Sequence, residues 1–255
     1  MTPRVLLLGG LDPSGGAGIT LDTAVVGAHG GAPLPIAVAL TEQGLRGFRR
    51  AHAVPVAQWR GALDAVLADG PAHAIKVGFV PDVATARALG DALAPLAATT
   101  PLVLDPVLSA TAGGYAAADA LAAALREGLA ARAALVTPNL PELALLAGGD
   151  PRALLAVGTR AVLAKGGHGE GAHSEDVLWA AGERRSYARL RLPTGRVRGT
   201  GCALASAIAV QLARGVAIGD ACAAAGDWLH RLLVGLGPAP AGDLPRTLPF
   251  DRLAP

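Results

Sequence analysis

Short apolar runs alternate along this chain with longer stretches in which apolar residues recur at helical spacing. The runs have the length of strands that are buried on both faces of a parallel sheet. They predict strands at residues 5–8, 34–40, 72–77, 102–104, 134–137 and 160–164. The helical stretches predict helices at residues 19–29, 56–68, 81–96, 116–129, 202–213 and 218–236, and a further helix opens at Asn139.

The pattern changes late in the chain. Residues 176–181 and 184–191 predict a hairpin with a turn at Ala181-Gly182, whereas the polar residues 46–55 are expected to leave the sheet. No internal repeat, low-complexity linker or break in composition divides the sequence. Strands alternating with helices therefore predict a single α/β domain over residues 1–255, with a mostly parallel sheet and an irregular tail from about residue 237.

The turn Gly199-Thr200-Gly201-Cys202 carries the most chemical information, because an apolar helix follows it directly. The first backbone N–H groups of a helix have no partners within the helix, and together with the helix dipole they favour a bound anion. Two glycines would let a phosphate approach the backbone closely. Cys202 is expected in the first turn, where a thiolate is stabilised and the thiol pKa falls. The alternative is a Gly-rich loop before a core helix with a small buried cysteine.

Other polar candidates follow predicted strands, at the edge of an α/β sheet where ligands bind. Asp12 and Asp22 lie in and after the Gly-rich turn that ends the first strand. Gln43 can donate and accept hydrogen bonds, as needed to read the edge of a heterocycle, although an exposed loop amide would show the same pattern. Phe79 follows the strand at 72–77 and fits either a core position or a platform for a ligand.

Two further candidates lie after later strands. Asn139 and Glu142 have the spacing of a helix capping box, and the same pair could hold a hydrated Mg²⁺ through water. Lys165 precedes two glycines, so its ammonium group could reach a phosphate while the backbone stays clear. It is one of two lysines, the other being Lys76, in a chain with 22 basic residues.

Composition narrows the function classes. A formal net charge of +2 over 255 residues does not indicate a nucleic-acid or anionic-membrane partner. Cys202 and Cys222 are too few for a disulfide scaffold, so we expect reduced thiols in a cytoplasm. The run at 5–8 lacks a convincing cleavage site, and glycines and prolines interrupt the charge-free run at 23–41, so neither predicts a signal peptide or a membrane span.

Neither Gly-rich turn fits the dinucleotide pattern GxGxxG, and GxxxxGK[ST] is absent from the sequence. These absences disfavour an oxidoreductase of the dinucleotide-binding type and exclude an ordinary P-loop enzyme.

Taken together, the segments resemble the ribokinase-like superfamily, and within it the hydroxymethylpyrimidine/phosphomethylpyrimidine kinases of thiamine biosynthesis. The resemblance runs from about residue 5 to residue 235, and its pieces are specific as an ordered set although each is weak alone. They are Asp12-Pro13-Ser14-Gly15-Gly16-Ala17-Gly18 with Asp22, Thr41-Glu42-Gln43, Lys76-Val77-Gly78, Asp105-Pro106-Val107, Thr137-Pro138-Asn139-Leu140-Pro141-Glu142, Lys165-Gly166-Gly167-His168 and Gly199-Thr200-Gly201-Cys202.

The resemblance implies a three-layer α/β/α fold, ATP and Mg²⁺. It also implies phosphorylation of the hydroxymethyl group of 4-amino-5-hydroxymethyl-2-methylpyrimidine, and then of the monophosphate to the diphosphate. The implied protein is a cytoplasmic homodimer that binds a small-molecule substrate and neither nucleic acid nor membrane.

The resemblance also assigns roles to residues. The turn 199–202 becomes the anion hole, and Cys202 becomes the base at a position where most of the superfamily has aspartate. The remaining implied site residues are Gln43, Asp22, Phe79 and Val107 for the pyrimidine, Lys165, Asn139 and Thr137 for ATP, and Glu142 and Asp105 for the metal.

Three positions depart from the pattern of the pyrimidine kinases. Gly44 stands where an asparagine often follows the glutamine, Phe79 where methionine is usual, and Arg198 where a histidine is typical. A larger Phe79 would narrow or reshape the pyrimidine pocket. The alternatives are therefore a pyridoxal or pyridoxine kinase on the same scaffold, or a non-catalytic relative that binds the pyrimidine phosphate; the intact polar candidates argue against the second.

Overall fold

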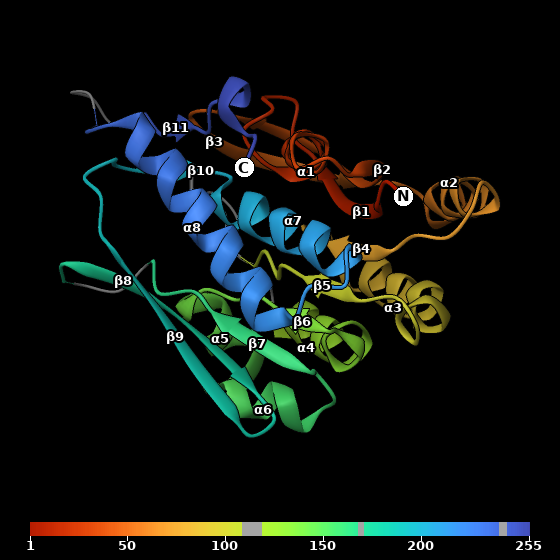
Figure 1. The fold of residues 1–255 in the computed structure, drawn as a ribbon. Coiled ribbons are helices and arrows are strands. Elements are labelled where there is room, and N and C mark those ends of the chain that lie inside the picture. Colours follow the sequence, from red (N-terminus) through yellow and green to blue (C-terminus); the bar gives the residue numbers. More distant parts are fainter. Residues whose placement is uncertain (109–118, 168–170, 240–243) are drawn as a thin grey trace.

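The computed structural model describes residues 1–108, 119–167, 171–239 and 244–255. Within these residues a nine-stranded sheet has the order β3-β2-β1-β4-β5-β6-β7-β8-β9 (Figure 1). The strands are β1 (Arg4–Leu11), β2 (Ala32–Gly44), β3 (Gly47–Ala53), β4 (Ala74–Val77), β5 (Leu102–Leu104), β6 (Leu135–Val136), β7 (Ala161–Ala164), β8 (His173–Ala180) and β9 (Glu183–Leu190). The six neighbouring strands β2, β1, β4, β5, β6 and β7 are parallel. At the two ends of the sheet, β3, β8 and β9 add antiparallel pairings.

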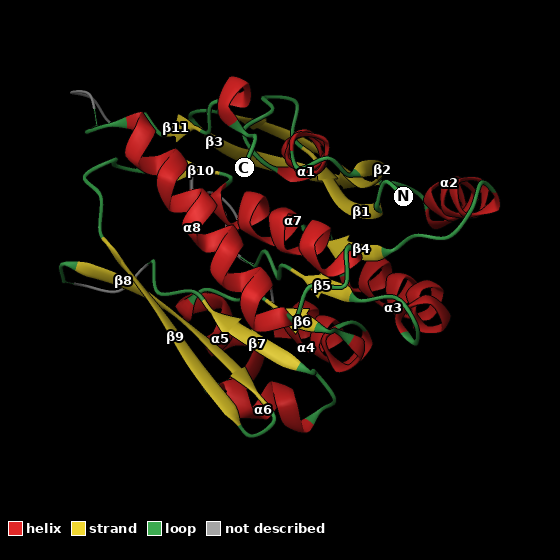
Figure 2. Cartoon of the chain, in the orientation of Figure 1, coloured by secondary structure: helices red, strands yellow, loops and turns green. Residues whose placement is uncertain are grey.

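Helices cover both faces of this sheet (Figure 2). They are α1 (Gly18–Ala28), α2 (Val56–Ala68), α3 (Val83–Ala97), α4 (Asp119–Gly128), α5 (Leu140–Ala147), α6 (Pro151–Ala156), α7 (Thr200–Ala213) and α8 (Ile218–Leu236). One hydrophobic cluster joins the sheet to α2 through α6, and a second joins it to α1, α7 and α8. The predicted three-layer α/β/α architecture with a mostly parallel sheet is therefore confirmed.

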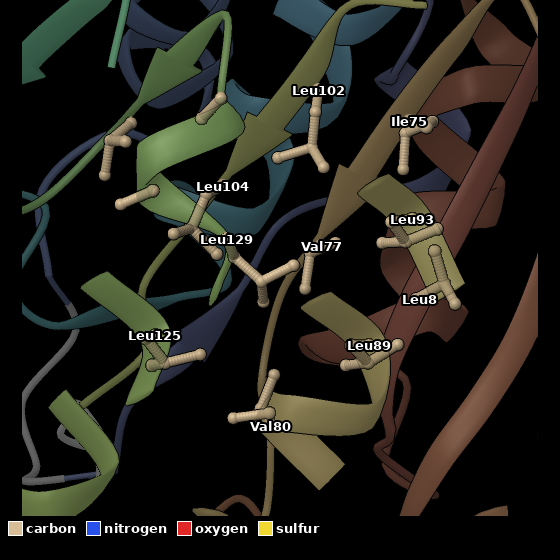
Figure 3. Packing of buried hydrophobic residues seen from close by; sticks show 14 of the residues in the cluster. Leu8, Ile75, Val77, Val80, Leu89, Leu93, Leu102, Leu104, Leu125 and Leu129 are labelled. Atoms are coloured by element: carbon tan, nitrogen blue, oxygen red, sulfur yellow. The ribbon is translucent and has the colours of Figure 1, made fainter. Parts of the chain in front are cut away.

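The central strand β1 shows why apolar runs predicted the sheet. Leu6 and Leu8 pack into the first cluster, whereas Val5 and Leu7 pack into the second, and all four side chains are fully buried. A strand covered on both faces has no polar side to alternate with its apolar one. Figure 3 shows the first cluster, in which Leu8, Val77 and Leu104 from three strands meet Leu89 of α3 and Leu125 of α4.

The polar segment 46–55 was predicted to leave the sheet, and this prediction was wrong. Residues 47–53 form β3, an antiparallel edge strand that pairs with β2. An edge strand tolerates polar residues because little of it is covered, so no apolar run marked it. As a consequence β2 continues to Gly44, and Gln43 lies in a strand rather than in the expected loop.

The predicted late hairpin is confirmed as β8 and β9, which pair from His173 with Leu190 to Ala180 with Glu183. Gly182, with φ of +74°, lies in the turn between them. Residues 244–255 of the tail are more regular than expected, since β11 (Arg246–Thr247) pairs with β10 (Val197–Arg198) and a 3₁₀ turn, η2 (Phe250–Arg252), follows. In the same layer Trp228 Nε1 of α8 donates a hydrogen bond of 3.1 Å to the Leu253 carbonyl.

No helix among the described residues combines the length and the apolar character that crossing a membrane requires.

Candidate active site

The carboxyl ends of the parallel strands meet the start of α7 around a cavity of about 200 Å³. Every site residue predicted from the sequence lines this cavity except Asp22 and Thr137. The strands and α7 bring these residues together because parallel strands end at the same edge of a sheet. His168, which belonged to one of the motifs, lies outside the described residues.

The N-terminus of α7 opens into the cavity. Its N-cap residue is Gly199, with φ of +79°, and within the described part of the chain no side chain caps this helix. A Cβ at Gly199 would collide with the Gly16 carbonyl oxygen and with Leu21, so this position requires glycine. Ala203 N donates to the Gly199 carbonyl at 2.8 Å, which makes the preceding amides of residues 200–202 the ones without partners within the helix.

Lys165 lies against this helix start. Its Nζ atom is 2.8 Å from Asp105 Oδ1, and a Cβ placed on Gly201 would lie 3.1 Å from the same nitrogen. Burial disfavours the charged form of Lys165, but the carboxyl groups of Asp105 and Glu142 outweigh it and raise the lysine pKa. A permanently charged ammonium group and the open helix start therefore face the same volume, which suits a phosphate.

The capping box predicted for Asn139 and Glu142 is present. Asn139 Oδ1 accepts from Glu142 N at 2.9 Å, and Glu142 Oε2 accepts from Asn139 N at 2.8 Å. Lys165 N also donates to the Pro138 carbonyl at 2.8 Å, which holds the lysine beside the start of α5. Burial raises the pKa of Glu142 to about 7, although Lys165 opposes the shift.

The donor atoms fit a magnesium ion that arrives with phosphates. Among the described residues, no group of three or more His, Cys, Asp or Glu side chains could hold a metal by itself. Asp105 and Glu142 nevertheless line the same cavity, and Mg²⁺ is commonly held by one or two carboxylates together with waters and substrate phosphates. A cation bound beside the buried carboxylate of Glu142 would offset the free energy that the carboxylate loses by desolvation.

The prediction that the helix start lowers the pKa of Cys202 was wrong. Cys202 lines the cavity, but burial raises the pKa of its thiol to about 12, even though the Lys76 ammonium group and the Gly18 N–H act to lower it. Desolvation of the thiolate outweighs these two groups, so the neutral thiol is favoured near pH 7.

Asp22 was expected at the pyrimidine, and the structure places it elsewhere. It is fully buried behind the cavity wall, where its two oxygens accept from Lys76 Nζ at 2.7 Å and from Ser206 Oγ at 2.8 Å. Thr137 is also buried and donates to Asp105 Oδ1 at 3.1 Å. Both residues therefore support the site from behind and make no contact with the cavity.

The far end of the cavity is lined by Gln43 and two aromatic rings. Phe79 lies with its ring centroid 5.9 Å from that of Phe48, at an interplanar angle of 53°. Phe48 was missed because its segment was predicted to leave the sheet. Its signal was an aromatic residue in a polar stretch, in a chain with only three phenylalanines.

A second cavity of about 270 Å³ lies beside the first and was not predicted. It shares Gly167 and Thr200 with the first cavity and extends along β9 and α8, past Arg189 and His230. The turn that opens α7 therefore lies where the two cavities meet.

Comparison with known proteins identifies the family. The model of the phosphomethylpyrimidine kinase family matches residues 12–238. The chain belongs to this family. A hydroxymethylpyrimidine/phosphomethylpyrimidine kinase from Rhizobium meliloti (strain 1021) is 35% identical over 263 residues, covering 94% of this chain and 96% of the relative. The enzyme of the same name from Escherichia coli (strain K12) is 31% identical over 241 residues, covering 90% of each chain.

A solved structure agrees with this assignment to the phosphomethylpyrimidine kinases. The phosphomethylpyrimidine kinase from Clostridium difficile 630 has a TM-score of 0.78 and 27% identity, and the match covers 90% of this chain and 99% of that one. The pyridoxal kinase from Staphylococcus aureus in complex with ADP has a TM-score of 0.87 but 20% identity, covering 99% and 94%. That second likeness shows the ribokinase-like fold alone, so it does not favour pyridoxal as the substrate.

Proposed function

We propose that this protein transfers the γ-phosphoryl group of ATP to the hydroxymethyl group of 4-amino-5-hydroxymethyl-2-methylpyrimidine, and then to the resulting monophosphate. The observation that carries the proposal is one cavity with two chemically different ends. One end holds the uncapped start of α7 and Lys165, and the other holds Gln43 with the contacting rings of Phe48 and Phe79. The first end suits a phosphoryl group and the second a flat polar heterocycle.

The two adjoining cavities suggest how the substrates are arranged. The nucleoside of ATP would occupy the second cavity, and its phosphates would reach the shared residues Gly167 and Thr200. The alcohol would occupy the first cavity and face the γ-phosphoryl group across the turn. The ADP complex of the Staphylococcus aureus pyridoxal kinase supports a nucleotide on this fold.

The chemistry follows from charge and position. The acceptor oxygen, which belongs to the alcohol in the first transfer and to the phosphate of the monophosphate in the second, forms a bond to the γ-phosphorus. The bond to the ADP oxygen breaks at the same time, and negative charge spreads over the equatorial oxygens. The amides of residues 200–202 and the Lys165 ammonium group lie where they would stabilise that charge. Asp105 and Glu142 would hold Mg²⁺, which neutralises phosphate charge when bound.

Cys202 is assigned a different role from the thiolate base predicted from the sequence. As a neutral thiol on the cavity wall it packs beside the alcohol, and the proton of the alcohol goes to a phosphoryl oxygen or to water. This is consistent with the loose transition state of phosphoryl transfer, in which the nucleophile needs little activation.

The test is a coupled ADP-release assay with hydroxymethylpyrimidine, its monophosphate and pyridoxine as acceptors. We expect ATP- and Mg²⁺-dependent turnover with both pyrimidines, and slower turnover with pyridoxine. Absence of turnover with either pyrimidine would refute the proposal. The homodimer and the cytoplasmic location stay predictions, which chromatography with light scattering and cell fractionation would check.

A further inference from the structure

Arg198 connects three segments that are far apart in the sequence. It lies on β10 directly before Gly199, and its guanidinium group is almost fully buried. Nη2 donates to Asp12 Oδ2 at 2.8 Å, while Nη1 donates to the Gly44 carbonyl at 2.8 Å and to Ser14 Oγ at 3.3 Å. The start of α7 is thereby joined to the turn after β1 and to the end of β2.

Asp12 accepts every hydrogen bond that it makes in the described part of the chain. Oδ1 accepts from the backbone N–H of Ser14 at 2.9 Å and from its hydroxyl at 2.7 Å. Oδ2 accepts from Arg198 and, at 3.2 Å, from Gln43 Nε2. A carboxylate that pairs with a guanidinium group can accept hydrogen bonds but cannot donate one.

This chemistry fixes the Gln43 amide. Because Asp12 cannot donate, the amide must turn its nitrogen toward Asp12, and its oxygen Oε1 then points away. As far as the described residues go, the contact with Asp12 is the one hydrogen bond of the Gln43 side chain. Oε1 and the second N–H therefore remain for a ligand in the cavity that Gln43 lines.

The backbone adds to this orientation. The pairing of β2 with β3 shifts register between Glu42 and Gln43, so Gln43 lies opposite Phe48 beyond a bulge. A bulge re-aims the side chains beside it. Arg198 holds the same strand end through the Gly44 carbonyl, so Gln43 is fixed both by its backbone and by its amide nitrogen.

The exposed edge of the amide matches one class of heterocycle. An aminopyrimidine presents a ring nitrogen that accepts next to an amino group that donates. Oε1 of Gln43 can accept from the amino group, and the second N–H can donate to the ring nitrogen. A pyridine alcohol without an amino group beside its ring nitrogen cannot make this pair, and leaving a buried acceptor unpaired is unfavourable.

We propose that Arg198 and Asp12 are positioning residues that lock the Gln43 amide in one orientation and thereby select aminopyrimidine alcohols over pyridine alcohols. The inference deepens the proposed function and rests on it. In this chain an almost fully buried ion pair, Arg198 with Asp12 at 2.8 Å, holds the amide in place.

The test measures kcat and KM of the full chain for hydroxymethylpyrimidine and pyridoxine, with the KM for ATP alongside. In Asp12→Asn the new amide can donate as well as accept, so Gln43 is free to turn over. We expect at least a tenfold drop in the ratio of kcat/KM for the pyrimidine over pyridoxine, arising from KM for the pyrimidine, with KM for ATP within twofold of wild type. Arg198→Lys, which loses the guanidinium fork, should move the ratio in the same direction by less.

The matched control is Asp82→Asn, the same chemical change at the N-cap of α3, where Asp82 accepts from Thr85 N at 2.7 Å. It should leave the ratio unchanged. Thermal unfolding of each variant identifies any variant that fails to fold. If Asp12→Asn does not fold, the change in the kcat/KM ratio is judged from Arg198→Lys. An unchanged ratio, or an equal loss for both alcohols, would overturn the inference and leave the pair a merely structural one.

Calorimetric binding of the two alcohols separates this inference from the proposed function. Selective pyrimidine binding that Asp12→Asn abolishes, without turnover in wild type, would refute the kinase reaction and support the lock. Wild-type protein that binds or phosphorylates pyridoxine in preference to the pyrimidine would refute the lock.

Discussion

Replacing Cys202 by alanine separates two possible roles of the thiol. With a pKa of about 12, the side chain is a thiolate in about one molecule in 10⁵ at pH 7. Forming that thiolate would require on the order of 7 kcal/mol, whereas general base catalysis typically contributes roughly 10²–10⁴-fold in rate. A neutral thiol contributes only its packing beside the alcohol. We therefore expect Cys202→Ala to lower kcat by less than about tenfold, with KM for ATP unchanged.

The decisive measurement is kcat at saturating substrates from about pH 7.5 to about 9.5, a range below the pKa of the thiol. If a thiolate were the base, wild-type kcat would rise about tenfold per pH unit and the slope would vanish in Cys202→Ala. We expect no such slope in either protein. Cys222→Ala is the matched control, because burial also raises the pKa of Cys222 to about 12 and this residue lies on α8, away from the first cavity. A steep slope lost only in Cys202→Ala, with kcat reduced more than about a hundredfold, would refute the reasoning.

Three further substitutions test the charges. Lys165→Ala removes a charged hydrogen-bond donor and should raise KM for ATP about tenfold or more; initial rates that give an unchanged KM would remove Lys165 from the nucleotide site. The pKa of Glu142 is about 7 in the folded protein and 4.5 as its ordinary value. The folded state therefore holds this proton more tightly, and the free energy of unfolding falls as the pH rises from 4.5 to about 7. Glu142→Gln should therefore raise the unfolding free energy of metal-free protein at about pH 8 by up to about 3 kcal/mol, and not at about pH 4, while lowering activity. His29 packs edge-on against Trp228, and burial lowers its pKa from 6.5 to about 4. Wild type should lose up to about 3 kcal/mol as pH falls between these values, and urea unfolding of His29→Phe should lack that loss.

The sequence predicted the sheet well where strands are buried on both faces. The runs at 5–8 and 102–104 have no polar face, so the apolar pattern by itself indicates that both faces of the strand are buried. The edge strand β3 has a polar pattern that resembles a loop, and only its pairing with β2 defines it. Helix α6 and the β10–β11 pair are too short to show a period, and they form because neighbouring elements pack against them.

The site could be predicted as a set of turns because parallel strands end at one edge. The direction in which a side chain points was harder to predict from the sequence. Asp22 lies on α1, and its partners Lys76 and Ser206 come from other elements, so its burial depends on tertiary packing. The pKa of Cys202 was misjudged for the same reason, since the helix dipole can be predicted locally whereas desolvation depends on everything that covers the thiol.

Two of the carboxyl groups that line the cavity, those of Asp105 and Glu142, differ in a way that bears on cation binding. Burial opposes the charged form of both. At Asp105 the ammonium groups of Lys165 and Lys76 outweigh burial and lower the pKa, so this residue is a carboxylate near pH 7. At Glu142 burial outweighs Lys165 and raises the pKa to about 7, and the like charge of Asp105 adds to the rise. Glu142 therefore gains more than Asp105 from a cation beside it. Asp105 is paired with Lys165, whereas the charge of Glu142 is less fully compensated, so a Mg²⁺ ion that binds in this cavity would be attracted to the start of α5.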